Sequence, residues 1–163
     1  MSKKLENVVI VGRMNVGKST LFNRLSSTVK SLILDYAGVT RDVLSDVVTW
    51  KDHTYELTDT GGISLRKSRN TIDEAVRQKA IEMLDHAALV LFMVDGKIGV
   101  LQEDVEIARV LHKLKIPVLL VINKADSKAT KEREYEFDKL GFPDTIAISA
   151  QHGLYIADLL DVI

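Results

Sequence analysis

Residues 12–19 read Gly12-Arg13-Met14-Asn15-Val16-Gly17-Lys18-Ser19. This octet matches the pattern G-x-x-x-x-G-K-[ST]. The apolar run 7–11 before it is typical of a buried strand, and residues 19–25 after it are typical of an amphipathic helix. The glycines let the backbone curl so that its N–H groups point inward, and the helix N-terminus adds a partial positive charge. The order strand, loop and helix therefore predicts a loop that holds phosphate groups.

Two side chains of this loop have an expected task. Lys18 should reach the terminal phosphates, and the Ser19 hydroxyl should bind Mg²⁺. Together with Thr20, all the residues of the octet are candidates for phosphate contacts. The loop by itself does not distinguish ATP from GTP.

The length and composition predict one domain over residues 1–163. The chain has a net charge of -1 and contains no cysteine. Disulfides, thiolate metal sites and cysteine nucleophiles are therefore excluded. A chain without a global positive field needs a local basic patch to contact nucleic acid, and no DNA partner is expected. The longest apolar run, 87–94, is far shorter than a membrane span, so we expect a cytoplasmic protein with no membrane partner.

Apolar runs alternate with helical patterns along the chain, which predicts a three-layer α/β fold with helices on both faces of a mostly parallel sheet. Because only four residues separate the second and third strands, these two should form an antiparallel hairpin. The expected strands are 7–11, 43–50, 55–58, 89–94, 118–122 and 145–148. The expected helices begin at residue 18, cover 71–85, 102–114 and 130–140, and run from 155 to the end.

A second motif, Asp59-Thr60-Gly61-Gly62, follows the third expected strand. Open α/β sheets bind ligands at the carboxyl ends of their strands. There Asp59 could bind Mg²⁺ through water, and the Gly62 N–H could approach a γ-phosphate closely. The same string is equally typical of a β-turn after a strand.

Thr40 lies between the two motifs, in the stretch Ala37-Gly38-Val39-Thr40-Arg41-Asp42. Its hydroxyl could bind Mg²⁺ and its N–H the γ-phosphate, which would order this stretch when GTP is bound. An ordinary threonine at the entry to a strand explains the residue equally well, and the sequence favours neither interpretation.

The base of the nucleotide is predicted by the motif Asn123-Lys124-Ala125-Asp126. The Asp126 carboxylate can accept two hydrogen bonds from guanine, whereas adenine offers no such pair of donors. Asn123 would bridge the base loop and the phosphate loop. The stem of Lys124 would cover the base plane. Further on, backbone N–H groups of Ser149 and Ala150 could meet the guanine carbonyl.

These motifs in this order resemble those of the translation-factor-related GTPases, and within them the Era-like group. The Der family of tandem GTPases, also called EngA, resembles the chain most, through its first G domain. The resemblance implies a Ras-like P-loop fold, GTP hydrolysis as a molecular switch, and a role in assembly of the large ribosomal subunit. It also implies that residues 1–163 are one G domain of a longer protein. Met14 and Ala37 depart from it, since the group usually has proline at these positions.

Ile63 stands where many GTPases carry a glutamine that orients the attacking water. Hydrolysis would then depend on the charges of Lys18, Mg²⁺ and the N–H groups of residues such as Thr40 and Gly62. Related GTPases hold K⁺ beside the phosphates with an asparagine that matches Asn15, so K⁺ is a candidate cofactor. Asn15 could equally serve only the turn conformation. A GDP/GTP-binding regulatory module with negligible hydrolysis remains the alternative function.

The basic residues Arg66, Lys67 and Arg69 follow the second motif closely. They could contact ribosomal RNA. A solvated basic loop is the simpler interpretation.

Overall fold

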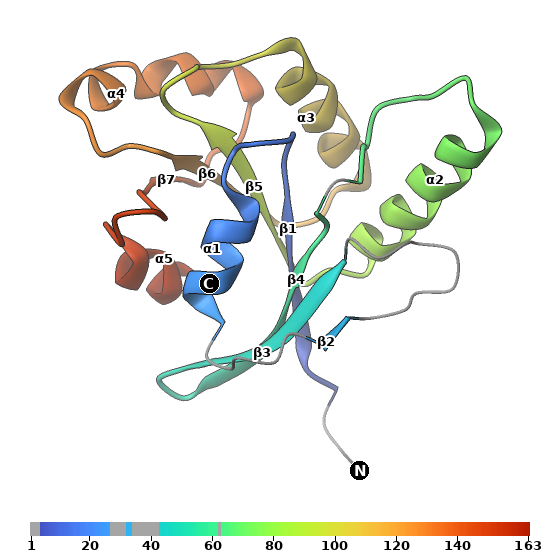
Figure 1. Ribbon diagram of the computed structural model, residues 1–163, viewed down its shortest axis with the longest axis horizontal. Helices are drawn as coiled ribbons and strands as arrows, with labels where there is room; N and C mark the ends of the chain where they lie inside the picture. Colours follow the sequence, from blue (N-terminus) through green and yellow to red (C-terminus); the bar gives the residue numbers. More distant parts are fainter. Residues whose placement is uncertain (1–3, 27–31, 34–42, 62) are drawn as a thin grey trace.

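The computed structural model describes residues 4–26, 32–33, 43–61 and 63–163. Within these residues the chain forms one seven-stranded sheet with the strand order β2-β3-β4-β1-β5-β6-β7 (Figure 1). The strands are β1 (Glu6–Val11), β2 (Leu32–Ile33), β3 (Leu44–Trp50), β4 (His53–Asp59), β5 (Leu89–Asp95), β6 (Val118–Asn123) and β7 (Thr145–Ala147).

All six expected strands are present, and β2 is an additional strand of two residues. The predicted hairpin is confirmed, because β3 pairs antiparallel with β4 from Leu44↔Asp59 to Trp50↔His53. β2 also pairs antiparallel with β3. Among the strands that the structure describes, β3 alone therefore runs against the others. A strand of two residues carries too short a pattern to be predicted from sequence.

The helices are α1 (Lys18–Leu25), α2 (Thr71–Asp85), α3 (Gln102–Leu114), α4 (Lys128–Glu132), the 3₁₀ helix η1 (Glu134–Leu140) and α5 (Ile156–Val162). The single helix expected over 130–140 is wrong. Its place is taken by α4 and η1, which meet at Arg133. The Arg133 side chain bonds Glu136 and the Lys97 carbonyl, which ties the break to the loop after β5.

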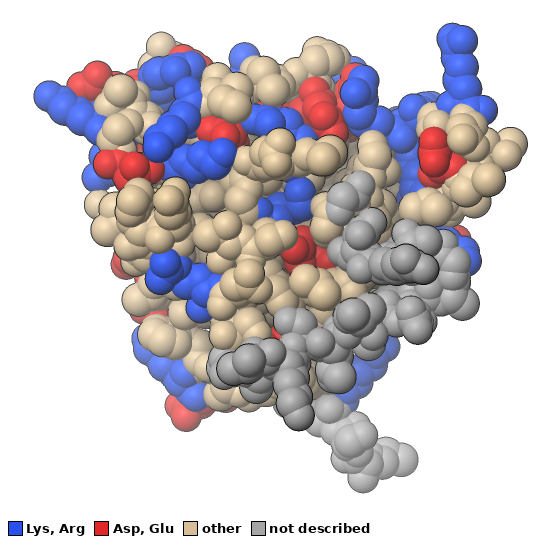
Figure 2. Space-filling view, viewed as in Figure 1, with Lys and Arg blue, Asp and Glu red and all other residues tan. Residues whose placement is uncertain are grey.

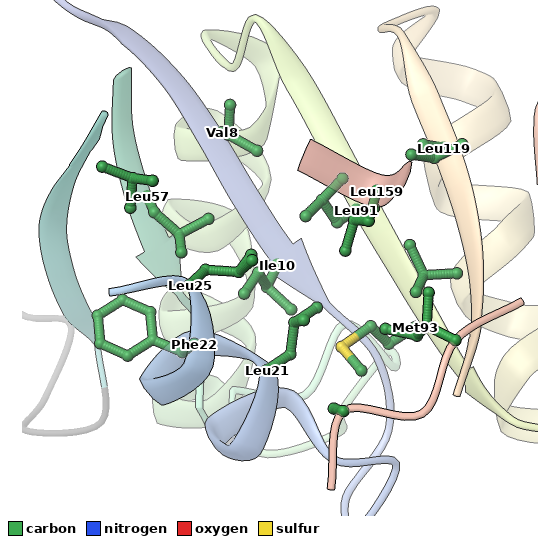
Figure 3. Packing of buried hydrophobic residues seen from close by; sticks show 14 of the residues in the cluster. Val8, Ile10, Leu21, Phe22, Leu25, Leu57, Leu91, Met93, Leu119 and Leu159 are labelled. Atoms are coloured by element: carbon green, nitrogen blue, oxygen red, sulfur yellow. The ribbon is translucent and has the colours of Figure 1, made fainter. Parts of the chain in front are cut away.

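Helices cover both faces of the sheet, as predicted. On one face α1 and α5 pack on alternate residues of the central strands, such as Val8 and Ile10 (Figure 3). On the other face α2, α3 and η1 pack on the residues between them, such as Val9 and Val11. Because side chains alternate along a strand, β1 is buried on both faces.

Parallel strands bring their carboxyl ends to one edge of the sheet, and the loops after β1, β4, β5 and β6 all leave from there. The two sequence motifs and Asn123 therefore meet at this edge. No helix among the described residues is long and apolar enough to cross a membrane.

Candidate functional site

A cleft of about 640 Å³ opens at the carboxyl edge of the sheet. Figure 2 shows basic and acidic side chains close together near the middle of this face. The cleft brings together residues from three of the predicted motifs. It is lined by Met14, Asn15, Gly17, Lys18, Ser19, Thr20, Leu44, Asp59, Gly61 and Lys124. Leu44, at the start of β3, is the one member that no motif indicated.

The loop between β1 and α1 keeps its shape because two positions accept only glycine. A Cβ on Gly12 would lie 2.5 Å from the Met93 carbonyl oxygen. Gly17 has φ 102°, and a Cβ there would collide with the Asn123 side-chain nitrogen. The two glycines thus let the loop lie directly against β5 and Asn123.

Lys18 lies along the loop, with only 6% of the residue exposed. Its Nζ donates to the Arg13 carbonyl at 2.8 Å. Burial lowers the pKa of Lys18, and the Asp59 carboxylate acts in the opposite direction. Phosphate oxygens at the loop would favour the charged ammonium.

Asp59 ends β4 and is 1% exposed. It accepts hydrogen bonds from the Gly61 N–H at 2.9 Å and from the Ser19 hydroxyl at 3.4 Å. Burial raises the pKa of Asp59, and the Gly61 bond and Lys18 only partly oppose this effect. Lys18, Ser19 and Asp59 are called the phosphate half of the site below.

A hard cation fits beside Ser19 and Asp59, since they supply a hydroxyl and a carboxylate 3.4 Å apart. Mg²⁺ takes only one or two protein carboxylates and completes its shell with water and phosphate oxygens. Among the described residues, no group of three or more His, Asp or Glu side chains is placed so that it could hold a metal ion. Of the remaining predicted residues, Thr40 and Gly62 lie outside the described part of the chain.

Asn123 connects the phosphate loop with the loop after β7. Its Nδ2 donates to the Val16 carbonyl at 2.8 Å, and its Oδ1 accepts the Ala150 N–H at 2.9 Å. The expected bridge is therefore present. The Ser149 N–H donates to the Leu154 carbonyl, so both N–H groups expected at a guanine carbonyl already have partners within the protein.

Lys124 adopts a left-handed conformation with φ 63°. Its Nζ donates to the Asn15 carbonyl at 2.8 Å and to Asp95 Oδ2 at 2.6 Å. Burial acts to raise the pKa of Asp95, but hydrogen bonds from Lys124 and from the N–H groups of Ile98 and Lys97 outweigh it and leave the pKa lowered. Asp95 was not predicted as a site residue, although an acid at the end of a buried strand was a usable signal.

Asp126 lies at the surface, beside a second hollow of about 420 Å³ that Lys128 and Tyr155 also line. Two basic side chains face its carboxylate, Lys97 at 3.6 Å and His152 at 3.7 Å. Asn123, Lys124, Asp126 and Asp95 are called the base half of the site below; of these four, Lys124 lines the cleft and Asp126 lines the second hollow.

Four predicted contact residues have buried or partly buried side chains that do not line the cleft. Val16 is fully buried, and the Thr60 hydroxyl donates to the Ile10 carbonyl at 2.9 Å. Ile63 packs against the cluster under α2 and α3. Arg13 lies 3.5 Å from Asp104 of α3, whose pKa burial raises.

The model of a known family matches residues 7–124, which is well over half of the chain, under the description "50S ribosome-binding GTPase". The chain belongs to this family. Among curated relatives, GTPase Der of Clostridium perfringens is 45% identical over 163 residues, and GTPase Der of Heliobacterium modesticaldum is 41% identical over 156. These alignments cover 99% and 96% of the chain, but only 36% and 35% of the relatives. The chain thus spans about a third of their length.

Solved structures agree with this family. Era from Aquifex aeolicus bound to GDP and AlF4⁻ superposes with a TM-score of 0.79 at 32% identity, over 98% of this chain and 56% of that one. Era in complex with MgGDPNP and a segment of 16S ribosomal RNA gives 0.78 at 32% identity, over 98% and 55%. The resemblance to Era-like and Der GTPases and the P-loop fold that it implied are confirmed.

Proposed function

We propose that this chain binds GTP with Mg²⁺ and hydrolyses GTP to GDP and phosphate, as a switch in the assembly of the large ribosomal subunit. The observation that carries the proposal is the bridge made by Asn123, three residues before Asp126, which joins the phosphate loop to the loop after β7. The family description and the relatives named GTPase Der support the same activity and partner. A ribosomal partner would set this activity in the cytoplasm. That residues 1–163 form one G domain of a longer protein stays a prediction.

Each half of the site has its own part in this proposal. Asp126 would accept the ring N–H and amino group of guanine, and Lys124 would cover the base. Lys18 and the backbone of residues 12–20 would hold the phosphates, with Ser19 and Asp59 holding Mg²⁺. The ion, when bound, would supply positive charge to the β- and γ-phosphates. Thr40 and Gly62 remain proposed contacts to the γ-phosphate.

Hydrolysis is best tested by single-turnover release of γ-phosphate from GTP in Mg²⁺, with ATP as the matched control nucleotide. We expect GTP but not ATP to be cleaved, because adenine would leave Asp126 without its donors. Lys18→Met should abolish release, since it removes the charge nearest the terminal phosphates. Equal cleavage of both nucleotides would contradict the guanine assignment.

Ile63 supports the second candidate function, a GDP/GTP-binding regulatory module with negligible hydrolysis. Its side chain packs into the cluster under α2 and α3, so it cannot orient a water at the phosphates. Tight GTP binding without single-turnover release would favour this module over the hydrolase.

We further propose K⁺ as a second cation, held by Asn15. Asn15 lies exposed in the cleft with φ 66°, and its carbonyl accepts Lys124. The test compares turnover in KCl and NaCl for the wild type and Asn15→Ala. We expect faster turnover in KCl for the wild type alone. Equal rates in the two salts would contradict the K⁺ proposal and leave the GTPase proposal intact.

A further inference from the structure

A groove of about 570 Å³ runs between α2 and α3, and no part of the proposed GTPase mechanism uses it. Five basic residues and one acidic residue line this α2–α3 groove. In Figure 2, Lys and Arg side chains gather at the upper right, over the segment that leads into α2 and lies beside α3 in this view. The chain as a whole has a net charge of -1, so this excess of positive charge is local.

Four of the five basic side chains form the exposed rim of the groove, from two separate elements. Arg66 and Lys67 come from the segment before α2, while Arg109 and Lys113 come from α3. Residues four apart lie on the same face of a helix, one turn from each other. Arg109 and Lys113 therefore present two cations in a row along one wall.

Among the described residues, few acidic groups neutralise the positive charge of this rim. Glu106 pairs with Arg66 at 2.7 Å. Across the part of the chain that the structure describes, the side chains of Lys67, Arg109 and Lys113 have no ion pair or hydrogen bond. The fifth basic residue, Arg77, is buried and donates to the Leu65 carbonyl at 2.8 Å.

The wall that carries Lys67 is thereby held in place. Arg77 fixes Leu65 through this bond and pairs with Glu74 at 2.8 Å, so residues 65–67 are fastened to α2. The floor between the walls is formed by the half-buried side chains of Ile81, Val110 and Leu114. A fixed groove with cations on both walls is complementary to an anionic chain that lies along it.

We propose that the α2–α3 groove binds the phosphate backbone of RNA. The charge pattern favours this occupant, since unpaired cations on two walls match a regular anionic backbone, which is contacted without regard to sequence. The proposal rests on the proposed ribosomal role, because the family is described as 50S ribosome-binding and one Era structure contains ribosomal RNA. It adds the surface through which this domain contacts RNA.

The test is fluorescence anisotropy of a labelled 20-nucleotide RNA hairpin, titrated with the 163-residue chain in Mg²⁺ and GDP at several salt concentrations. The double variant Arg109→Glu/Lys113→Glu should weaken binding by about tenfold or more. It should also make the negative slope of log K against log[salt] shallower by about 1.5 to 2, because two phosphate contacts are lost. The neutral pair Arg109→Gln/Lys113→Gln should give the same loss of slope.

The matched control is Lys4→Glu/Lys139→Glu, which makes the same change in charge at two exposed positions outside the groove. We expect less than a twofold effect on RNA binding from it. Equal losses of RNA affinity in Arg109→Glu/Lys113→Glu and in the control Lys4→Glu/Lys139→Glu, or no measurable RNA binding by the wild type, would overturn the proposal. Tighter binding of an acidic peptide than of RNA would also overturn it, in favour of a protein partner.

GTP turnover is measured on the same samples. Wild-type turnover in the groove variants shows that they are folded and that the groove acts apart from the cleft. If turnover is absent from the wild type as well, the GTPase proposal fails, while the RNA result is judged separately on its own titration.

Discussion

In the phosphate half, burial lowers the pKa of Lys18 and raises the pKa of Asp59. Both shifts favour the neutral form of the side chain. In the base half, hydrogen bonds from Lys124 and two backbone N–H groups lower the pKa of Asp95 and keep it charged. One half therefore holds charges that gain from a ligand, and the other holds charges that already stabilise each other. Such a site can have a preformed base half and still respond strongly to phosphate and Mg²⁺.

The largest effect is expected from a substitution in the base half that removes the proposed contact to guanine. Asp126→Asn should weaken GDP binding by about 100-fold or more and favour the xanthine nucleotide, because the amide cannot accept both guanine donors. Isothermal titration with GDP and XDP measures the preference. Asp138→Asn, an exposed acid on η1, serves as control. Intact GDP affinity in Asp126→Asn would show that Asp126 does not read the base.

The next largest effect is expected from Asn123→Ala, which tests whether the base half is already formed without nucleotide. Asn123→Ala should lower the free energy of unfolding by about 2–4 kcal/mol, because the buried Ala150 N–H and Val16 carbonyl both lose their partner. Urea denaturation measures it. Asn70→Ala, which removes only the N-cap bond to the Ile72 N–H, should cost about 1 kcal/mol. A smaller loss at Asn123 than at Asn70 would argue against a preformed bridge.

Two identical substitutions, one in each half, test the comparison directly. Asp95→Asn should destabilise the nucleotide-free chain by about 1–3 kcal/mol at pH 7, since Lys124 loses its charged partner. The lowered pKa of Asp95 stabilises the fold above the unfolded pKa of about 4, and this contribution is lost as pH falls through the folded pKa. The difference between variant and wild type should therefore shrink in acid, as thermal unfolding across pH would show.

Asp59→Asn should have the smallest effect and the opposite sign. The raised pKa of Asp59 favours the fold only below the unfolded pKa of about 4, and this stability is lost as pH rises through the folded pKa. At neutral pH the variant should therefore be about 1 kcal/mol more stable without nucleotide. The same thermal scans measure it. Destabilisation similar to that of Asp95→Asn would remove the contrast between the halves.

Part of the site was visible in the sequence because its residues stand at strand ends. Asp59 and Asn123 end the apolar strands β4 and β6, and Lys18 follows the loop that leaves the end of β1. A parallel sheet brings such ends together. Asp95 has the same placement, but its role depends on Lys124, which lies 29 residues later and reaches it only through a left-handed backbone turn. The partners of Ser149 and Ala150 were missed for a related reason, since backbone N–H groups leave no mark in a sequence.

The sequence by itself determined the fold class, the hairpin and the order of the nucleotide motifs, because periodicity and glycine spacing are local properties. Only the tertiary structure decided which charges are paired, which side chains of the phosphate loop turn inward, and that α2 and α3 enclose a basic groove. Those features depend on burial and on contacts between residues far apart in the chain. Arg13 illustrates the difference, since its motif predicts a phosphate contact, while packing sets its side chain against Asp104.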